Sequence, residues 1–583
     1  MIEYRLSFSQ EQKHYIDISV TCAAISGTTI FILPVWTPGS YVIRNHSRHI
    51  VKKYATLNGH EEPVHTINKN SWSVNSKPGD IVIFYYTIYS WDWSVRTCVL
   101  EEEFAHIVGA AAFVRVLNLE NEAHVVRWEK HKNDWTCATA MKPYKDDNSW
   151  VSAGYDEFID HPMLLGNLTQ FSWDLEGIIH HMAITTRADI DRESIIQMLS
   201  KIILAQKYIF GSPPKVLTEY YFLVITSDKL IGGLEHRRSS SLICPRISLQ
   251  CGRNNRQSKR YIDFLSLCSH EHFHMWWVKL FKPKELVTYD YDRENYTSLL
   301  WLFEGMTSYY GNLSLVRSGV TTAEEYLLYL AKTIKAVESY AGYDKQTAAE
   351  ASFESWTKYY QTPENRLNSQ VSYYEKGELI ALYTNCYIMV SSGGKYCLDN
   401  VLRELWARYG SSDHLGMSEE DWYGAIIDVT GIDASQVIRR LVHHHDHVEW
   451  EPLLSSVGIS YKAAKVCEST PSLGVSFVAS NKPGLTIDQV LEDGSAMTAG
   501  LGSGDRIIAI DQIECTESTL DVMLNTSAVV GNKSTVHFIR QGLLRTAVMT
   551  WLKSPLKFEH CSLTIDDLNH PYLRMLLHIN AIN

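Results

Sequence analysis

Hydrophobic and polar residues alternate in short runs over the first 165 residues, a pattern that predicts β-strands. Residues 15–23 (YIDISVTCA) alternate strictly, and residues 28–35 (TTIFILPV) and 81–89 (IVIFYYTIY) are rich in β-branched and aromatic side chains. Turn signals such as Pro38-Gly39 lie between these runs. We therefore expect an antiparallel β-sandwich over residues 1–165.

The periodicity changes after residue 165, where we expect a second domain over residues 166–320. Residues 220–225 have the pattern of a buried strand. Residues 261–281 have helical spacing without glycine or proline, which predicts a helix that ends just before Pro283. A second helix is predicted from residue 297 to about residue 316.

Helical spacing dominates residues 321–454, for example over 322–341 and 376–391, and predicts an α-helical domain. A histidine-rich stretch at 443–447 (HHHDH) could hold a metal, but its position favours a solvated linker. Short strands and frequent glycines return in residues 455–555.

Composition limits the classes of function. The 583 residues are enough for about three to five domains. A net charge of −12 argues against coating nucleic acid, because phosphate binding needs clustered positive charge. No apolar run is long enough to predict a transmembrane helix, and Met1–Leu6 lack the layout of a secretory signal. The eleven cysteines include no CxxC pair, which argues against disulfides and favours a cytoplasmic location.

The most informative segment is His270-Glu271-His272-Phe273-His274, an HExxH motif. Two imidazoles four residues apart on a helix lie one turn apart on one face and can share one zinc ion. Glu271 can then act as general base on a water molecule, whereas His272 lies on another face. A surface helix that carries these groups by chance is the alternative, but the strongly apolar flanks argue against it.

A catalytic zinc ion needs a third protein ligand. The best candidate is Glu304 in the apolar helical segment Trp301-Leu302-Phe303-Glu304-Gly305. An unpaired carboxylate would be costly in such surroundings, so a metal or a salt bridge must compensate it. The two segments together predict a zinc hydrolase.

Several motifs make the sequence similar to one family. HExxH followed by the Trp-Leu-Phe-Glu-Gly segment resembles gluzincin metallopeptidases related to aminopeptidase N. The segments that narrow this resemblance to the glycyl-aminopeptidase family are 33–41 (LPVWTPGSY), 232–236 (GGLEH), 270–279 (HEHFHMWWVK) with Pro283, and 300–310 (LWLFEGMTSYY). The resemblance implies a multidomain α+β protein with an N-terminal β-sandwich, a thermolysin-like zinc catalytic domain, an α-helical domain and a C-terminal PDZ domain.

The resemblance also implies roles for individual residues. His270, His274 and Glu304 would be the zinc ligands and Glu271 the base. The 232–236 loop would bind substrate through Gly233 and Glu235, with Glu235 on the free α-amino group, unless this loop is only a structural turn. Tyr374, in Tyr374-Glu375-Lys376-Gly377, would stabilise the oxyanion, although a packing role is the alternative for any tyrosine here.

Residues 455–555 resemble a PDZ domain, and 556–583 follow as a C-terminal extension. Residues 472–475 (SLGV) resemble the loop that binds a peptide C-terminus. A structural cover for the catalytic cleft is an equally good interpretation of this module.

The sequence therefore predicts an aminopeptidase that uses one zinc ion and acts on peptides. The family resemblance implies glycine or alanine as the residue removed. Two alternatives remain open at this stage: a zinc endopeptidase, and a PDZ-type peptide-binding scaffold with a vestigial metal site.

Overall fold

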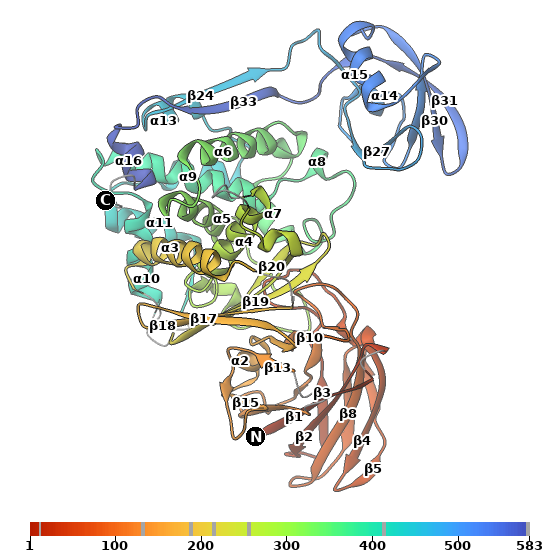
Figure 1. The fold of residues 1–583 in the computed structure, drawn as a ribbon, viewed down its shortest axis with the longest axis vertical. Helices are drawn as coiled ribbons and strands as arrows, with labels where there is room; N and C mark the ends of the chain where they lie inside the picture. The colour runs from red at the N-terminus through yellow and green to blue at the C-terminus, as the bar shows by residue number, and fades with distance from the viewer. Residues whose placement is uncertain are drawn as a thin grey trace. The chain divides into compact units, whose positions relative to one another are not determined.

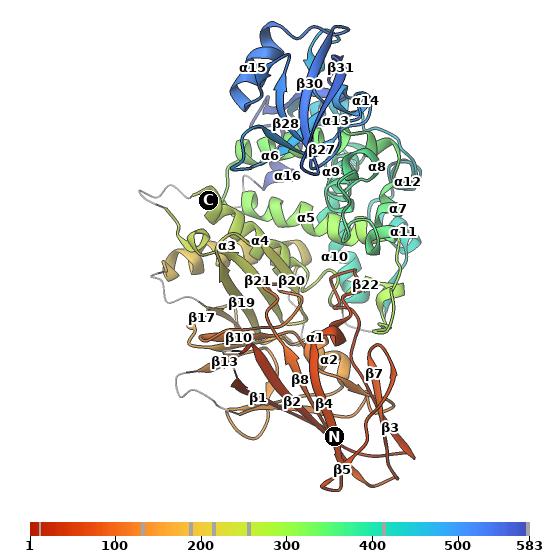
Figure 2. The same ribbon diagram turned by 90° about the vertical axis from the view of Figure 1, so that its right-hand side faces the viewer.

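The computed structural model describes residues 1–10, 13–129, 135–185, 190–212, 217–252, 258–410 and 415–578 (Figures 1 and 2). Residue contacts divide the chain into two units, which we describe separately. Unit 1 comprises residues 1–296, 310–321 and 402–418, and unit 2 comprises 297–309, 322–401 and 419–583. The protein is a multidomain mixed α/β protein with a β-rich N-terminal domain and a largely helical region after it. None of the helices among the described residues combines the length and apolarity that a membrane crossing requires.

Unit 1 begins with an eight-stranded sheet in the order β14-β15-β12-β1-β2-β8-β4-β5. The strands predicted at 15–23 and 81–89 are confirmed as β2 and β8, whereas the strand expected at 28–35 ends at Ile32. β1 pairs with β12 in parallel, so the antiparallel prediction is wrong for this pair. The strands of this sheet are β1 (Ile2–Gln10), β2 (Tyr15–Ala23), β4 (Ile50–Leu57), β5 (His60–Glu62), β8 (Ile81–Tyr89), β12 (His124–Trp128), β14 (Lys142–Pro143) and β15 (Ser149–Ser152).

Two four-stranded sheets complete the β-rich domain, in the orders β13-β16-β10-β9 and β11-β3-β7-β6. Their strands are β3 (Thr28–Ile32), β6 (His65–Asn68), β7 (Ser71–Asn75), β9 (Val99–Leu100), β10 (Phe104–Ile107), β11 (Arg115–Val116), β13 (Thr136–Ala138) and β16 (Met163–Gly166). Two short helices, α1 (Gly109–Ala112) and α2 (Tyr155–Ile159), lie between strands of this domain.

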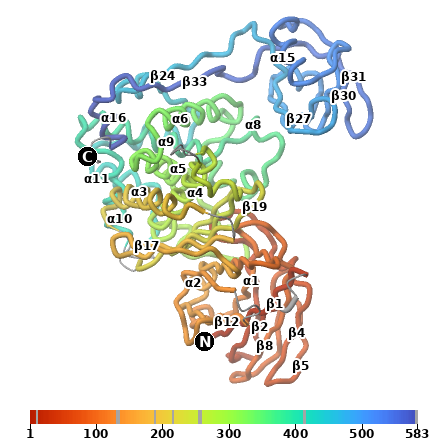
Figure 3. Tube along the Cα trace, viewed as in Figure 1, coloured from red at the N-terminus to blue at the C-terminus, as the bar shows by residue number. Residues whose placement is uncertain are grey.

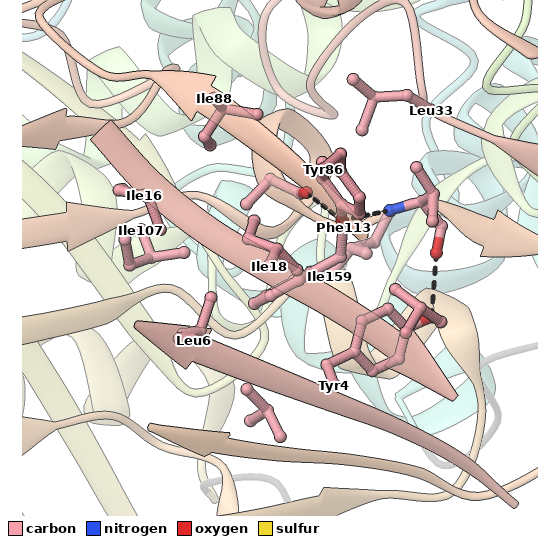
Figure 4. Packing of buried hydrophobic residues seen from close by; sticks show 14 of the residues in the cluster. Tyr4, Leu6, Ile16, Ile18, Leu33, Tyr86, Ile88, Ile107, Phe113 and Ile159 are labelled. Carbon is pink, nitrogen blue, oxygen red and sulfur yellow. Dashed lines mark hydrogen bonds between the residues drawn. The ribbon is translucent and has the colours of Figure 1, made fainter. Parts of the chain in front are cut away.

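The core of this domain consists of apolar side chains packed around tyrosines whose hydroxyls form hydrogen bonds (Figure 4). The Tyr86 hydroxyl donates to the Ala112 carbonyl at 2.7 Å and accepts from the Val114 N–H at 3.3 Å. The Tyr4 hydroxyl donates to the Val114 carbonyl at 2.9 Å. The rings of Tyr4 and Tyr86 are thus buried with their hydroxyls hydrogen-bonded.

The second part of unit 1 is a five-stranded sheet in the order β17-β18-β19-β21-β20. Glu176 and Gly177 join β17 to β18 and both have positive φ, as a type I′ hairpin turn requires. Helix α4 packs against β20, β21 and helix α3 (Figure 2). These elements are β17 (Thr169–Leu175), β18 (Ile178–Ile184), β19 (Glu219–Ser227), β20 (Gly232–Glu235), β21 (Ser239–Pro245), α3 (Arg192–Phe210) and α4 (Lys259–Phe273).

Helix α4 is shorter than predicted. Ser258 caps its start by accepting from the Tyr261 N–H, and His274 is its C-cap, so the helix ends well before residue 281. Further along, Val278 has φ 101°, so the helix cannot resume through this residue, and the Val278 N–H donates to the Phe281 carbonyl at 2.6 Å. A valine gives no turn signal in the sequence, which is why the prediction ran on to the proline.

Unit 2 contains most of the helices (Figure 1). Helix α5 (Leu300–Arg317) is shared, because the division between the units falls after Tyr309. Helix α6 (Ala323–Glu338) starts with a capping box formed by Thr322 and Glu325, close to the predicted start. The other main helices of the region are α7 (Ala348–Phe353), α8 (Arg366–Ser369), α9 (Tyr373–Ser391), α11 (Glu419–Thr430), α12 (Ser435–His443) and α13 (Trp450–Ser455). Helix α10 (Leu398–Tyr409) is shared as well, because residues 402–418 belong to unit 1.

The histidine-rich stretch forms the end of α12 and the connector to α13. His443 Nε2 lies 2.8 Å from a Glu419 carboxylate oxygen, and His447 Nε2 lies 3.1 Å from an Asp344 carboxylate oxygen. Neither group of potential metal ligands in the described residues includes these histidines. This arrangement agrees with the linker interpretation.

The chain then forms a two-stranded ribbon that leads to a small module and back (Figure 3). The module has a hydrophobic core of its own and a six-stranded sheet, with β26-β27-β28-β30-β31 in order and β29 paired with β28. The ribbon strands are β24 (Ile459–Lys465) and β33 (Phe558–Ile565), and helix α16 (Pro571–Leu577) follows. The module comprises β26 (Val475–Val478), β27 (Leu485–Val490), α14 (Ser495–Thr498), β28 (Arg506–Ile510), β29 (Ile513–Glu514), α15 (Glu517–Thr526), β30 (Lys533–Arg540) and β31 (Leu543–Thr550).

All eleven cysteines are free thiols, which confirms the expectation that the chain has no disulfide framework.

Candidate metal centre

Helix α4 places the imidazoles of His270 and His274 one turn apart, as the motif predicts. The His274 N–H still bonds to the His270 carbonyl, at 3.4 Å, so the helical geometry extends through the motif. The two Nε2 atoms lie 3.1 Å apart. Two nitrogens bound to one tetrahedral zinc ion would lie about 3.4 Å apart, given Zn–N bonds of about 2.0–2.1 Å. The pair therefore fits a shared zinc ion with little adjustment.

Helix α5 supplies the third candidate ligand. His270, His274 and Glu304 each offer a ligand atom, and these atoms all lie within 4.8 Å of one another. The Glu304 side chain is buried, with 2% of its surface exposed. A carboxylate in such a place is stabilised by a cation, so the donor set of two imidazoles and one carboxylate fits a catalytic zinc ion.

Helices α4 and α5 approach closely at Gly311. A Cβ atom built on Gly311 would lie 3.4 Å from the His270 Cα atom, and the Ser269 hydroxyl donates to the Gly311 carbonyl at 2.8 Å. This contact fixes the main chain of α5 against the first histidine of the motif.

A main-chain carbonyl orients the second histidine. His274 Nδ1 lies 3.1 Å from the Trp277 carbonyl oxygen, which can only accept, so Nδ1 carries the proton and Nε2 keeps its lone pair. The sequence identified no such partner, because the turn at 275–278 that brings the carbonyl back is not evident from residue types. The early end of α4 thus serves the metal-binding geometry.

A buried amide holds α4 from its other face. His272 Nδ1 donates to Gln206 Oε1 of α3 at 2.7 Å, and Gln206 Nε2 donates to the Ser269 carbonyl at 2.7 Å. Burial lowers the pKa of His272 well below its usual value, so this histidine is neutral. His272 belongs to neither group of potential metal ligands among the described residues, in agreement with the prediction.

Residues 232–235 of the predicted loop form strand β20, which lies against Glu271. A Cβ atom on Gly233 would lie only 2.1 Å from Glu271 Oε1, so only glycine allows this approach. Glu235, Glu271 and His274 also offer ligand atoms within 4.8 Å of one another, and all three are buried. Two carboxylates are therefore held beside the second histidine of the motif.

Tyr374 lies in helix α9, which crosses α5 at two glycines. A Cβ atom on Gly305 would lie 2.5 Å from the Gly377 Cα atom, and one on Gly377 would lie 2.1 Å from the Trp301 carbonyl oxygen. The crossing brings Tyr374 near Glu304: burial and then the Glu304 carboxylate raise the pKa of Tyr374 well above its usual value. Its phenol therefore keeps its proton at neutral pH and can donate a hydrogen bond.

The structure thus gathers the predicted site residues. His270, His274 and Glu304 form one group, Glu235 and Glu271 join His274 in a second, Gly233 contacts Glu271, and Tyr374 lies near Glu304. Sequence reasoning missed the Trp277 carbonyl and the Gln206 amide.

Comparison with known proteins places this site in a family. The model of the peptidase M61 N-terminal domain matches residues 3–167, and that of the M61 glycyl aminopeptidase matches residues 263–380. A crystal structure of an aminopeptidase N family protein from Idiomarina loihiensis is 32% identical and covers 99% of this chain and 100% of that chain, with a TM-score of 0.93. The chain belongs to the M61 glycyl aminopeptidase family. The protein is accordingly a peptidase, and the family assignment supports a metallo-aminopeptidase.

More distant structures also match this M61 family member. An M1 zinc metallopeptidase from Deinococcus radiodurans is 11% identical and covers 77% of this chain and 94% of that chain, with a TM-score of 0.46. Legionella pneumophila aminopeptidase A in complex with aspartic acid is 12% identical and covers 76% of this chain and 49% of that chain, with a TM-score of 0.48. No curated protein matches the chain.

Proposed function

We propose that this protein is a zinc-dependent aminopeptidase that removes the first residue from peptides. The observation that carries the proposal is the convergence of ligand atoms from His270, His274 and Glu304 beside two further buried carboxylates. The three residues would hold one zinc ion. When bound, zinc supplies a Lewis acid that polarises the scissile carbonyl and lowers the pKa of water.

Glu271 is the proposed general base. Its carboxylate would accept a proton from the attacking water molecule and pass it to the leaving amine. The contact with Gly233 restricts where this carboxylate can lie. Tyr374 would donate a hydrogen bond to the developing oxyanion, a role that requires a protonated phenol and agrees with its raised pKa.

Glu235 is the proposed anchor for the free α-ammonium group of the substrate, with Gly233 as the other substrate-binding residue of the loop. Its carboxylate is buried and lies within 4.8 Å of the ligand atoms of Glu271 and His274. A fixed negative charge this close to the proposed base attracts the positively charged α-ammonium group of a peptide, and so favours cleavage after the first residue. This placement supports an aminopeptidase over an endopeptidase.

The free amino group is the property to test. Purified enzyme should hydrolyse a free peptide much faster than the same peptide with an N-acetyl group, with Glu271→Gln as the inactive control. Equal rates on the two peptides would support the endopeptidase alternative instead. Zinc content measured by elemental analysis should fall in Glu304→Ala, and retention of full zinc content would count against Glu304 as a ligand.

We also propose that the enzyme prefers glycine or alanine as the first residue, as the family assignment suggests. A panel of aminoacyl chromogenic substrates tests this preference directly. Higher kcat/KM for leucyl or phenylalanyl substrates than for glycyl and alanyl ones would contradict it.

We propose the following domain organisation: a β-sandwich over 1–165, a thermolysin-like catalytic domain over 166–320, a helical domain over 321–454, a PDZ domain over 455–555 and an extension over 556–583. A separate hydrophobic core supports the PDZ assignment. The Leu473-Gly474 loop is held by main-chain bonds from Ala496 and Leu491. Peptides with a free C-terminus should bind the full-length protein more tightly than C-terminally amidated ones, and equal affinities would contradict peptide capture at this loop.

A further inference from the structure

A turn of the N-terminal β-rich domain lies directly against the carboxylate of Glu235. A Cβ atom built on Gly39 would lie 2.5 Å from Glu235 Oε1 and 2.8 Å from Glu235 Oε2, and 2.7 Å from the Cδ1 atom of the neighbouring Leu234. No side chain larger than hydrogen fits between this turn and the carboxylate. The main chain of Gly39 is therefore one wall of the space that Glu235 occupies.

The geometry of the turn also requires glycine. The Ser40 N–H donates to the Thr37 carbonyl at 2.9 Å across Pro38 and Gly39, and Gly39 has φ 85°. Proline followed by a residue with positive φ defines a type II turn. An L-residue at Gly39 would be strained by the backbone and would also collide with Glu235.

Buried hydrogen bonds keep this turn in place. The Thr37 hydroxyl has one proton, which it donates to the Arg96 carbonyl at 3.0 Å, so it accepts from His46 Nε2 at 3.1 Å. Burial lowers the pKa of His46 to about 3, which keeps its ring neutral. Arg44 Nη2 donates to the Ser40 hydroxyl at 2.7 Å. The turn cannot easily move away from a Cβ atom on Gly39.

The strand that carries Glu235 is also held in place. Glu235 pairs with Ser240 in the β20–β21 ladder. The next residue, His236, donates from Nδ1 to Asp160 Oδ1 at 3.1 Å, and Lys279 Nζ donates to the same oxygen at 2.8 Å. With both main chains fixed, a Cβ atom on Gly39 would have to displace the side chains of Glu235 and Leu234.

We propose that Gly39 is a positioning residue for recognition of the substrate's α-ammonium group. By carrying no side chain, it lets the Glu235 carboxylate occupy the position in which it meets the amino terminus of a peptide. The β-rich domain thus takes part in substrate recognition and is not merely a support. This inference rests on the proposed role of Glu235 as the amine anchor.

The test compares two glycine-to-alanine variants with similar backbone strain. Gly39→Ala introduces the collision, whereas Gly59 has φ 86° and no atom within 4 Å of its Cβ position, so Gly59→Ala introduces strain alone. Gly39→Ala should raise KM for a free peptide and lower kcat/KM by about ten- to a hundredfold. Zinc content should stay unchanged in both variants, and Gly59→Ala should keep wild-type kinetics. Similar kinetics in the two variants would overturn the inference.

The same substitution in a Glu235→Ala background separates positioning from general damage. With no carboxylate to displace, only the contact with Leu234 remains, so Gly39→Ala should lower kcat/KM there by much less than in the wild-type background, because interacting residues show non-additive effects. An equal loss in both backgrounds would show a merely structural role and overturn the inference.

Two further outcomes are decisive. If Glu235→Ala retains the preference for free over N-acetylated peptides, the amine-anchor role itself fails, whatever Gly39→Ala does. If Gly39→Ala is insoluble, the double variant replaces it. Recovery of soluble protein after removal of the carboxylate supports the collision with Glu235, whereas continued insolubility assigns the damage to Leu234 or to the backbone and overturns the inference.

Discussion

Gly233→Ala tests whether the position of the Glu271 carboxylate limits catalysis. The added Cβ atom would lie 2.1 Å from Glu271 Oε1, and real Cβ contacts are essentially never shorter than 3.0 Å, so the two must separate by at least 3.0 − 2.1 = 0.9 Å. A displacement of about 1 Å of a reacting group can lower the rate about a hundredfold. We therefore expect kcat to fall by about two orders of magnitude while zinc content stays at the wild-type level.

The neighbouring glycine provides the control. A Cβ atom on Gly232 would lie 3.5 Å from an Arg96 guanidinium nitrogen and 3.6 Å from the Ile243 Cγ2 atom, which are ordinary contacts, and both glycines belong to β20. The assay is steady-state hydrolysis of an aminoacyl chromogenic substrate, with elemental analysis of each preparation. Equal kcat values for Gly232→Ala and Gly233→Ala would refute the reasoning.

Three further predictions concern the helical region. In Gly377→Ala the Cβ atom would lie 2.1 Å from a main-chain oxygen of α5, so the free energy of unfolding measured by thermal denaturation should fall by about 3 kcal/mol. Gly424→Ala is the control: its Cβ atom would have no neighbour within 4 Å, and the free energy of unfolding should rise by about 0.5–1 kcal/mol. Tyr374→Phe should lower kcat by about a hundredfold or more without loss of zinc, and unchanged kcat would assign the residue to packing. The Glu338 carboxylate, 3.9 Å from His447 Nδ1, and the Asp344 carboxylate raise the pKa of His447. The stabilising effect of this histidine should therefore be present below about pH 6.5 and lost as the pH rises through the raised value. The difference in melting temperature between wild type and His447→Gln should therefore shrink from pH 6 to pH 9, and a constant difference would contradict this.

The sequence predicted those features that depend on residues close together in the chain, such as single strands and the spacing of side chains on one helix. Strict alternation gave the bounds of β2, and the HExxH spacing predicted two imidazoles on one helix face. His270 and His274 lie close together because any helix brings residues four positions apart onto the same face. Glu304 was predictable because a carboxylate in an apolar helix needs a partner.

Features that depend on contacts distant in sequence were not predictable. Helix α4 ends at Phe273, and Val278 in the turn that follows has a positive φ, although valine rarely adopts one. The parallel pairing of β1 with β12 was not predictable, because polar and apolar residues alternate in the same way in parallel and antiparallel strands. Gly39 reads only as part of a turn signal, and nothing in its neighbourhood indicates that the turn faces Glu235.

The most direct test of the central claim is anomalous diffraction at the zinc edge from crystals of the purified protein. The account predicts one strong peak at about 2.0–2.2 Å from the Nε2 atoms of His270 and His274 and a carboxylate oxygen of Glu304. A peak bound by Glu235 and Glu271 instead, or the absence of any peak in an active preparation, would contradict it.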